Sequence, residues 1–163
     1  MNDKYSLLFK FIQIIFIVMV PVGIITVSFD FLLLPIPWWL SWFICIVILV
    51  AGIYIFFLSK KEFDNSGQKL TAKACGTSKL MTSGIYSSIR HPHNLATVLL
   101  NLSIAFIFKS TIGLILAFVY IIMGYIFTLE EEKLLIQQFG DEYGEYKEKV
   151  PMFFPKLRKK RDI

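Results

Sequence analysis

Charged residues are scarce in this chain of 163 residues, at 18% of the total, whereas hydrophobic residues reach 56%. Its two cysteines, Cys45 and Cys75, lie in an apolar stretch and a polar loop, which argues against a disulfide framework. No group of His, Cys, Asp and Glu has metal-ligand spacing, so we expect no metal. Phe, by contrast, occurs 16 times. A soluble fold of this length could not bury so much apolar surface, and we expect a lipid bilayer to cover part of it.

The apolar residues are concentrated in four stretches without charge. These stretches are Phe11–Phe29, Trp38–Leu58, Leu95–Phe108 and Thr111–Leu129. A helix needs about 20 apolar residues to cross a bilayer, and all but the third stretch approach that length. Only Lys109 and Ser110 separate the third and fourth stretches, which predicts an antiparallel helical hairpin. Whether this hairpin crosses the bilayer fully stays open.

The polar tail carries a helical pattern of its own. Leu135, Phe139, Tyr143, Tyr146 and Val150 recur every three or four residues, which places them on one face of a helix. We therefore expect the fourth apolar helix to continue into an amphipathic helix in the cytosol. The predicted fold is an all-α integral membrane protein with four hydrophobic helices and this C-terminal helix. Residues 1–58 would form two transmembrane helices, and 59–163 the loop, hairpin and tail.

Lysine and arginine predict the orientation. Residues 30–37 contain neither, whereas residues 59–94 and the tail from residue 130 are rich in both. Basic loops stay in the cytosol, so we expect both termini and both basic regions there, with Lys109 as the exception. The net charge of +5 flanks apolar segments, which indicates topology and lipid headgroups rather than nucleic acid. The small size and the lack of sorting signals favour a prokaryotic inner membrane.

Two polar clusters lie at the boundaries of the predicted hairpin. Arg90-His91-Pro92-His93-Asn94 precedes the third helix, where Pro at the first position and free N–H groups favour an anion. Glu130-Glu131-Glu132 follows the fourth helix, and a bound cation would relieve its repulsion. Taken alone, each cluster also fits a headgroup anchor or a solvated helix end. The hairpin brings both to one membrane face, where together they suit a zwitterionic, cationic ligand.

A longer set of motifs resembles one superfamily. Leu80-Met81-Thr82-Ser83-Gly84-Ile85-Tyr86, Ile89-Arg90-His91-Pro92, the pair Glu131-Glu132 and the block Phe139-Gly140-Asp141-Glu142-Tyr143 follow in order. This arrangement resembles the isoprenylcysteine carboxyl methyltransferase and phospholipid methyltransferase superfamily. The resemblance implies a cytosol-facing pocket for S-adenosylmethionine lined by Ser78, Lys79, Leu80, Met81, Gly84, Tyr86, His91, Pro92, His93, Asn94 and Glu132. We expect Glu131, Glu132 and Arg90 to act in the transfer itself.

The chain departs from this pattern in two places. Asn94 stands where the family usually has a tyrosine, and residues 126–129 lack the arginine that the protein-carboxyl branch carries before its glutamate pair. The second departure argues against a carboxylate acceptor. The sequence thus predicts a membrane methyltransferase that acts on a lipid-like or small hydrophobic acceptor. The alternative is a non-enzymatic membrane scaffold or ligand binder that retains the fold. A transporter is disfavoured, because no apolar stretch carries an ionisable residue at its centre.

Overall fold

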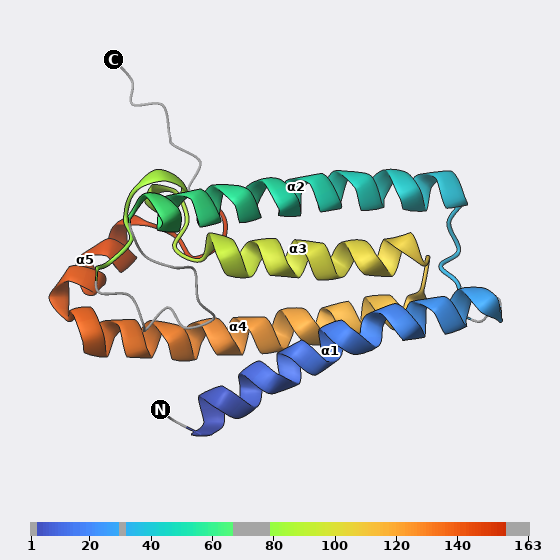
Figure 1. The fold of residues 1–163 in the computed structure, drawn as a ribbon, viewed down its shortest axis with the longest axis horizontal. Helices are drawn as coiled ribbons and strands as arrows, with labels where there is room; N and C mark the ends of the chain where they lie inside the picture. Colours follow the sequence, from blue (N-terminus) through green and yellow to red (C-terminus); the bar gives the residue numbers. More distant parts are fainter. Residues whose placement is uncertain (1–2, 30–31, 67–78, 156–163) are drawn as a thin grey trace, which may run out of the picture.

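The computed structural model describes residues 3–29, 32–66 and 79–155, and all regular elements in these ranges are helices. The elements in chain order are α1 (Asp3–Ser28), α2 (Trp38–Asn65), the 3-10 helix η2 (Gly84–Ser87), α3 (Pro92–Ile107), α4 (Thr111–Phe139) and α5 (Asp141–Lys149). Figure 1 shows α2, α3 and α4 running side by side, with α1 inclined across them. The predicted all-α fold is confirmed.

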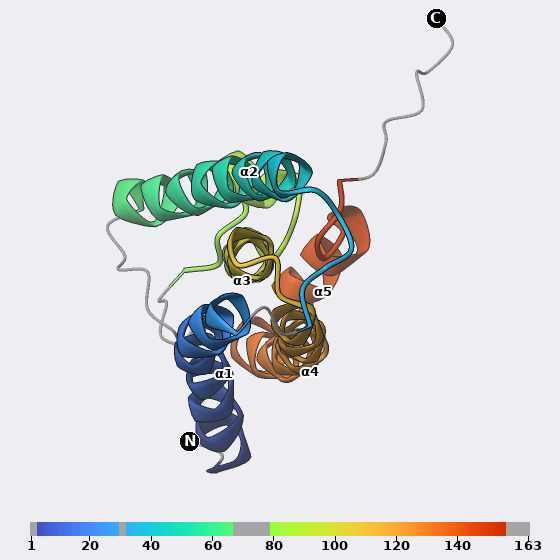
Figure 2. The same ribbon diagram turned by 90° about the vertical axis from the view of Figure 1, so that its right-hand side faces the viewer.

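Helix α3 lies at the centre of the bundle and packs against α1, α2 and α4 (Figure 2). Close approach of α2 and α3 depends on Gly52, where an added Cβ would lie 3.2 Å from Leu99 Cβ. Small residues allow membrane helices to approach closely in this way. The core between α1, α3 and α4 contains Ile15, Met19, Ala105, Ala117 and Tyr120.

The predicted hairpin is present, since α3 and α4 are antiparallel and joined by residues 108–110. The Ser110 hydroxyl caps α4 by accepting a hydrogen bond from Gly113 N at 2.9 Å. The loop before α2 pairs with this turn, because Leu34 N donates to Lys109 O at 2.8 Å and Thr111 N donates to Leu32 O at 3.0 Å. Lys109 Nζ lies 5.2 Å from the centre of the Trp38 ring. These contacts close the end of the bundle that we call the loop end.

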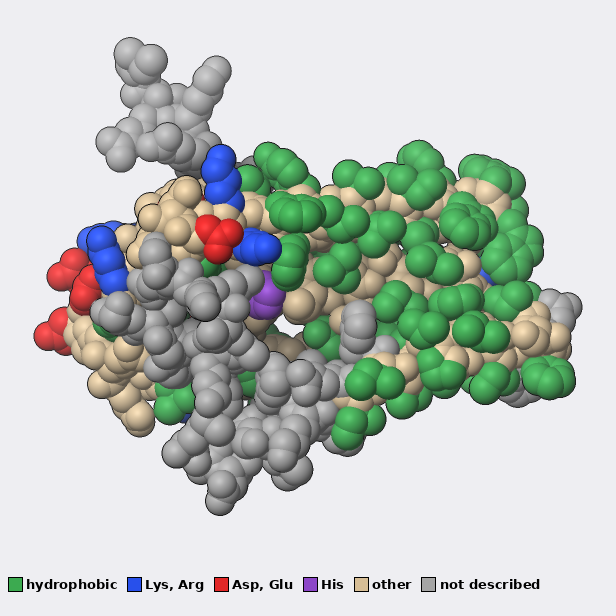
Figure 3. All heavy atoms as spheres, in the orientation of Figure 1, with side chains coloured by type: hydrophobic (Ala, Val, Ile, Leu, Met, Phe, Trp, Pro, Cys, Tyr) green, Lys and Arg blue, Asp and Glu red, His purple; other side chains and the backbone are tan. Residues whose placement is uncertain are grey.

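The outer surface of the long helices is apolar, as a membrane protein requires. Helices α2 and α4 are long and apolar enough to cross a membrane, and most of their apolar segments are not buried by the rest of the protein. Trp39 is 71% exposed and Phe118 is 63% exposed, for example. Figure 3 shows hydrophobic side chains over the right-hand part of the molecule and acidic side chains gathered at the left. Crossing by α1 and α3, whose described apolar parts are shorter, stays a prediction.

The tail differs from the single continuous helix that we expected. Helix α4 ends at Phe139, the chain turns at Gly140 with φ of +55°, and α5 begins at Asp141. Glycine adopts this left-handed conformation without steric cost, so the helix breaks there. The predicted apolar face still comes together, because Leu135, Tyr143, Tyr146 and Val150 form one buried cluster with Leu80. The turn folds α5 back toward the start of α3.

Candidate functional site

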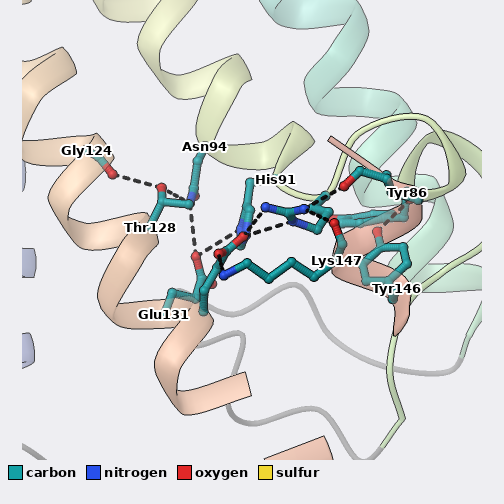
Figure 4. A network of polar contacts seen from close by, with 11 residues as sticks. Tyr86, His91, Asn94, Gly124, Thr128, Glu131, Tyr146 and Lys147 are labelled. Atoms are coloured by element: carbon teal, nitrogen blue, oxygen red, sulfur yellow. Dashed lines mark hydrogen bonds and ion pairs between the residues drawn. The ribbon is translucent and has the colours of Figure 1, made fainter. Parts of the chain in front are cut away.

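The site lies at the end of the bundle opposite the loop end, where the start of α3, the last turns of α4 and α5 meet (Figure 4). His91 is the N-cap of α3 and Pro92 is its first residue. Proline costs no hydrogen bond at the first helical position, because the N–H there has no partner in the helix. The segment after α5 holds this start in place. Arg90 N donates to Pro151 O at 2.9 Å, and His91 N donates to Met152 O at 3.1 Å. The side chains of Arg90, His91 and Asn94 thereby reach α4.

Glu132 is a buried carboxylate surrounded by cations. Its side chain is 2% exposed, and its Oε1 accepts from Arg90 Nε at 2.9 Å and lies 2.7 Å from Arg90 Nη2. Its Oε2 lies 2.7 Å from Lys147 Nζ on α5. Burial alone would raise the pKa of Glu132, but the contacts with His91, Lys147 and Arg90 outweigh it and lower the pKa to about 2. The carboxylate is therefore ionised at neutral pH.

Arg90 joins three elements through one guanidinium group. Besides the contacts with Glu132, its Nη1 donates to the carbonyl oxygens of Lys147 at 2.7 Å and Val150 at 2.6 Å. These carbonyls lie at the end of α5, where the helix leaves them without helical partners. A fork of five donors suits this task, and a lysine ammonium could not reach all of these acceptors. Arg90 thus fixes α5 against the α3–α4 hairpin.

Glu131, the adjacent carboxylate, is hydrogen-bonded to a neutral amide. Its Oε2 accepts from Asn94 Nδ2 at 3.0 Å, and the same amide nitrogen donates to Thr128 Oγ1 at 3.0 Å. The Thr128 hydroxyl in turn donates to Gly124 O at 2.8 Å. Asn94, which departs from the family pattern, therefore links α3 to α4 by hydrogen bonds. Its carboxylate partner is also buried, with a side chain 8% exposed.

His91 lies between the two carboxylates. Its Nδ1 is 3.4 Å from Glu131 Oε2, and its Nε2 is 3.4 Å from Glu132 Oε1. Burial alone would lower the pKa of His91, but the two carboxylates outweigh it and raise the pKa above its usual value. The imidazole ring therefore bridges the two acids.

A second set of hydrogen bonds holds the segment before α3. The Tyr86 hydroxyl lies 2.8 Å from Ser59 Oγ on α2, and the Tyr146 hydroxyl donates to Tyr86 O at 2.6 Å. Burial raises the pKa of Tyr86 to about 12, despite the opposing hydrogen bond from Ser59, so the phenol stays neutral. Gly84 has φ of +55°, and the Glu62 carboxylate packs where a Cβ would stand. Glycine is therefore required at this position.

The predicted site residues fall into distinct groups. Arg90, His91, Asn94, Glu131 and Glu132 meet in one network, as the hairpin predicts. The side chains of Leu80 and Met81 are buried in two apolar clusters, and the exposed Lys79 begins the described segment. Predicted pocket residue Ser78 lies outside the described residues. The imidazole of His93 packs on Phe56 of α2, with ring centres 5.4 Å apart, instead of joining the network.

Sequence reasoning missed Lys147 and Thr128 as members of the site. No spacing relates Lys147 to Glu132, because their contact depends on the turn at Gly140. Thr128 had a signal that could have been used, since it lies one turn before Glu131 and Glu132 and so faces the same side of α4. Tyr143 was expected only in the apolar face, yet it lies close to Glu132 and its hydroxyl is buried.

Several buried polar atoms of the site have no hydrogen-bond partner among the described residues. They are His91 Nε2, Glu132 Oε2 and the Tyr143 hydroxyl. Two of these atoms make ion-pair contacts instead, because His91 Nε2 lies 3.4 Å from Glu132 Oε1 and Glu132 Oε2 lies 2.7 Å from Lys147 Nζ. A polar ligand that replaced such imperfect contacts would complete the hydrogen bonding of the group. Donors and a carboxylate together fit the ammonium and carboxylate groups of S-adenosylmethionine. No three or more His, Cys, Asp or Glu side chains are grouped to hold a metal ion in the described part of the chain.

Comparison with known families supports the same family as the motifs. A search of curated proteins found no significant match. A family model described as phospholipid methyltransferase matches residues 31–142, which is more than half of the chain and includes both carboxylates and the start of α3. The resemblance drawn from the motifs is thus confirmed, and the chain belongs to the phospholipid methyltransferase family.

Proposed function

We propose that this chain transfers a methyl group from S-adenosylmethionine to a lipid-like or small hydrophobic acceptor at the cytosolic face of a membrane. The observation that carries the proposal is the buried network of Arg90, His91, Glu131 and Glu132 at the end of an apolar hairpin. Ionisable groups at a membrane boundary are costly to bury, and they are typical of functional sites. Membership of a methyltransferase family supplies the reaction class.

The cofactor would be held on the α5 side of the network. Glu132 Oε2 faces α5, where it pairs with Lys147 at 2.7 Å, and a carboxylate oxygen has a second lone pair that can accept a bond from the ammonium of a bound amino acid. Lys147 is 42% exposed in its side chain and can turn toward a carboxylate of the ligand. Arg90 keeps Glu132 in position, and Tyr86 and the buried start of α3 shape the remaining wall.

Bound S-adenosylmethionine would supply an electrophilic methyl group on a sulfonium sulfur. The protein's task is then to align the two substrates, exclude water and keep the acceptor atom nucleophilic. Neither a metal nor a covalent enzyme intermediate is needed for such a displacement. The acceptor would enter from the bilayer, where the exposed apolar faces of α2 and α4 offer contact with lipid.

Radioactive methyl transfer in vesicles tests this function. Purified protein is reconstituted into vesicles of phosphatidylethanolamine and phosphatidylglycerol, and label from S-adenosylmethionine is followed into the lipid fraction. We expect transfer that S-adenosylhomocysteine inhibits and that Glu132→Gln reduces at least about 100-fold, because the cofactor side loses its carboxylate. Glu130→Gln is the matched control, since Glu130 is half exposed and pairs only with Lys133 in the described part.

Transfer that survives Glu132→Gln undiminished would contradict this site. A folded wild-type protein that transfers no label and binds no cofactor would favour the non-enzymatic scaffold.

A further inference from the structure

Two neighbouring carboxylates with different surroundings suggest two tasks. We propose, on the basis of the function proposed above, that Glu131 accepts the proton of the methyl acceptor, whereas Glu132 serves only the cofactor side. The acceptor would accordingly carry a protonated amine or a thiol at the reacting atom. The sequence leads us to expect both carboxylates in the transfer, and the partners of each carboxylate now give it a separate role.

Glu132 is poorly placed to accept a proton. Arg90 makes two contacts with its Oε1, and Lys147 lies 2.7 Å from its Oε2. Two neighbouring positive charges stabilise the ionised form of a carboxylate and make it a weak base. The contacts of Arg90 with the end of α5 add rigidity to this arrangement. Glu132 therefore binds and positions the cofactor.

Glu131 has no lysine or arginine contact among the described residues, and its one ionisable contact is the shared His91 imidazole at 3.4 Å. The contacts that the described residues make with it, from Asn94 and His91, both fall on Oε2. Asn94 is neutral, and its amide hydrogens are shared between this carboxylate and Thr128. Oε1 is thus the oxygen left to face a ligand. A carboxylate held on one side by neutral and shared donors can take a proton from an acceptor on its other side.

The two carboxylates also lie toward different sides of the site. In Figure 4, Glu131 lies with Asn94, Thr128 and Gly124, on the side opposite Lys147 and Tyr146. Thr128 and Gly124 belong to the part of α4 that continues into its apolar stretch. Figure 3 shows the surface hollowed beside a histidine side chain, where the charged end of the molecule meets the apolar helices. An acceptor arriving from the bilayer would therefore meet Glu131 first.

The reaction balances with Glu131 in this role. The acceptor's N–H or S–H bond breaks, its proton goes to Glu131 Oε1, and its electron pair stays on nitrogen or sulfur. That electron pair forms the bond to the methyl carbon while the carbon–sulfur bond of the cofactor breaks, its electrons remaining on sulfur. A carboxylate acceptor needs no such base and would be repelled by Glu131. The geometry therefore disfavours carboxylates independently of the motif comparison.

The test compares cofactor binding with turnover in four proteins. Wild type, Glu131→Gln, Glu131→Asp and the surface control Glu130→Gln are assayed for methyl transfer to vesicles of phosphatidylethanolamine and phosphatidylglycerol. S-adenosylhomocysteine affinity is measured on the same preparations by calorimetry. We expect Glu131→Gln to lower kcat at least about 100-fold while its Kd stays within about threefold of wild type. Glu131→Asp should retain part of the rate, and Glu130→Gln all of it.

The pH profile gives a readout that a structural role would not move. The described titratable groups that interact with Glu131 are Tyr86, His91, His93 and Tyr143. Arg90 and Lys147 belong to the neighbouring network through Glu132. All of them are kept in Glu131→Gln, so its pH profile reports the missing base. Between pH 7 and pH 10 the deficit should shrink, because an amine acceptor then loses its proton to water.

Two results would overturn the division of roles. One is a loss of cofactor affinity in Glu131→Gln with kcat preserved, and the other is a deficit that stays constant across this pH range. A wild-type protein that binds no cofactor and transfers no methyl group is a different failure, because it removes the proposed function together with this one.

Discussion

The two ends of the helical bundle handle their polar groups in opposite ways. At the loop end, backbone hydrogen bonds join residues 32–34 to residues 109–111, and Lys109 rests on the Trp38 ring. At the site end, Glu131 and Glu132 are buried among cationic and neutral partners, and three polar atoms lack a well-aligned hydrogen bond. Polar groups that are hydrogen-bonded to their neighbours stabilise the fold, whereas buried charges with incomplete hydrogen bonding indicate a ligand-binding site.

The largest expected effect is at the site end, in Arg90→Met. This substitution removes one of the two cations from the buried Glu132 and frees the end of α5. Breaking a buried ion pair by removing one partner costs about 3–5 kcal/mol, so the variant should be less stable by that order and bind cofactor poorly. Thermal unfolding in detergent and calorimetry measure both. An Arg90→Met protein with wild-type stability would show that the network is not what holds α5.

Acid should weaken the same end through Glu132. The folded protein lowers the pKa of this carboxyl to about 2 from 4.5, so its contribution to stability is present above pH 4.5. That contribution is lost as the pH falls from about 4.5 toward 2. In this range the unfolded protein binds a proton at Glu132 that the folded protein does not, and proton binding therefore favours unfolding. Unfolding curves at several pH values measure it, with Glu132→Gln as the variant in which this part of the pH dependence is absent. Identical acid sensitivity in both proteins would contradict the assignment.

Two glycines near the site should respond in opposite directions to alanine. Gly84→Ala would force φ of +55° on a side chain and displace the Glu62 carboxylate, costing about 1–3 kcal/mol. Gly144→Ala, inside α5 with open space around it, should instead stabilise by about 0.5–1 kcal/mol. Thermal unfolding of both variants beside wild type measures these changes in stability. Equal effects at the two positions would mean that the turn before α3 is not constrained as described.

The smallest effect is expected at the loop end. Lys109→Ala removes the contact with Trp38 and should cost about 0.5–1 kcal/mol of stability. Its cofactor affinity should equal that of wild type, because Lys109 lies at the opposite end of the bundle from Glu132. Reduced cofactor affinity in Lys109→Ala would show that the loop end and the site end are coupled, contrary to the prediction.

The sequence predicted the elements that depend on local pattern. Apolar length and the short Lys109–Ser110 connection predicted the α3–α4 hairpin, and Pro92 predicted where α3 begins. Because antiparallel neighbours bring their distant ends together, the meeting of Arg90 and Glu132 followed from this hairpin alone. A large part of the candidate site was therefore accessible without a structure.

The features that escaped prediction depend on a single backbone turn. The helical spacing from Leu135 to Val150 continues across Gly140, so the pattern predicted one helix where the chain folds back. The direction of that fold determines which side chains of α5 reach α4, and thus brings Lys147 to Glu132. Side-chain periodicity records which face is apolar, but it does not record the angle between two helices.

Calorimetric titration of S-adenosylhomocysteine into the detergent-purified protein shows whether the site end binds the cofactor. Wild type is compared with Glu132→Gln at the site end and Lys109→Ala at the loop end. We predict saturable binding by wild type and Lys109→Ala, and at least a tenfold weaker Kd in Glu132→Gln, equivalent to about 1.4 kcal/mol. No binding by a folded wild type, or equal binding by all three proteins, would contradict this prediction.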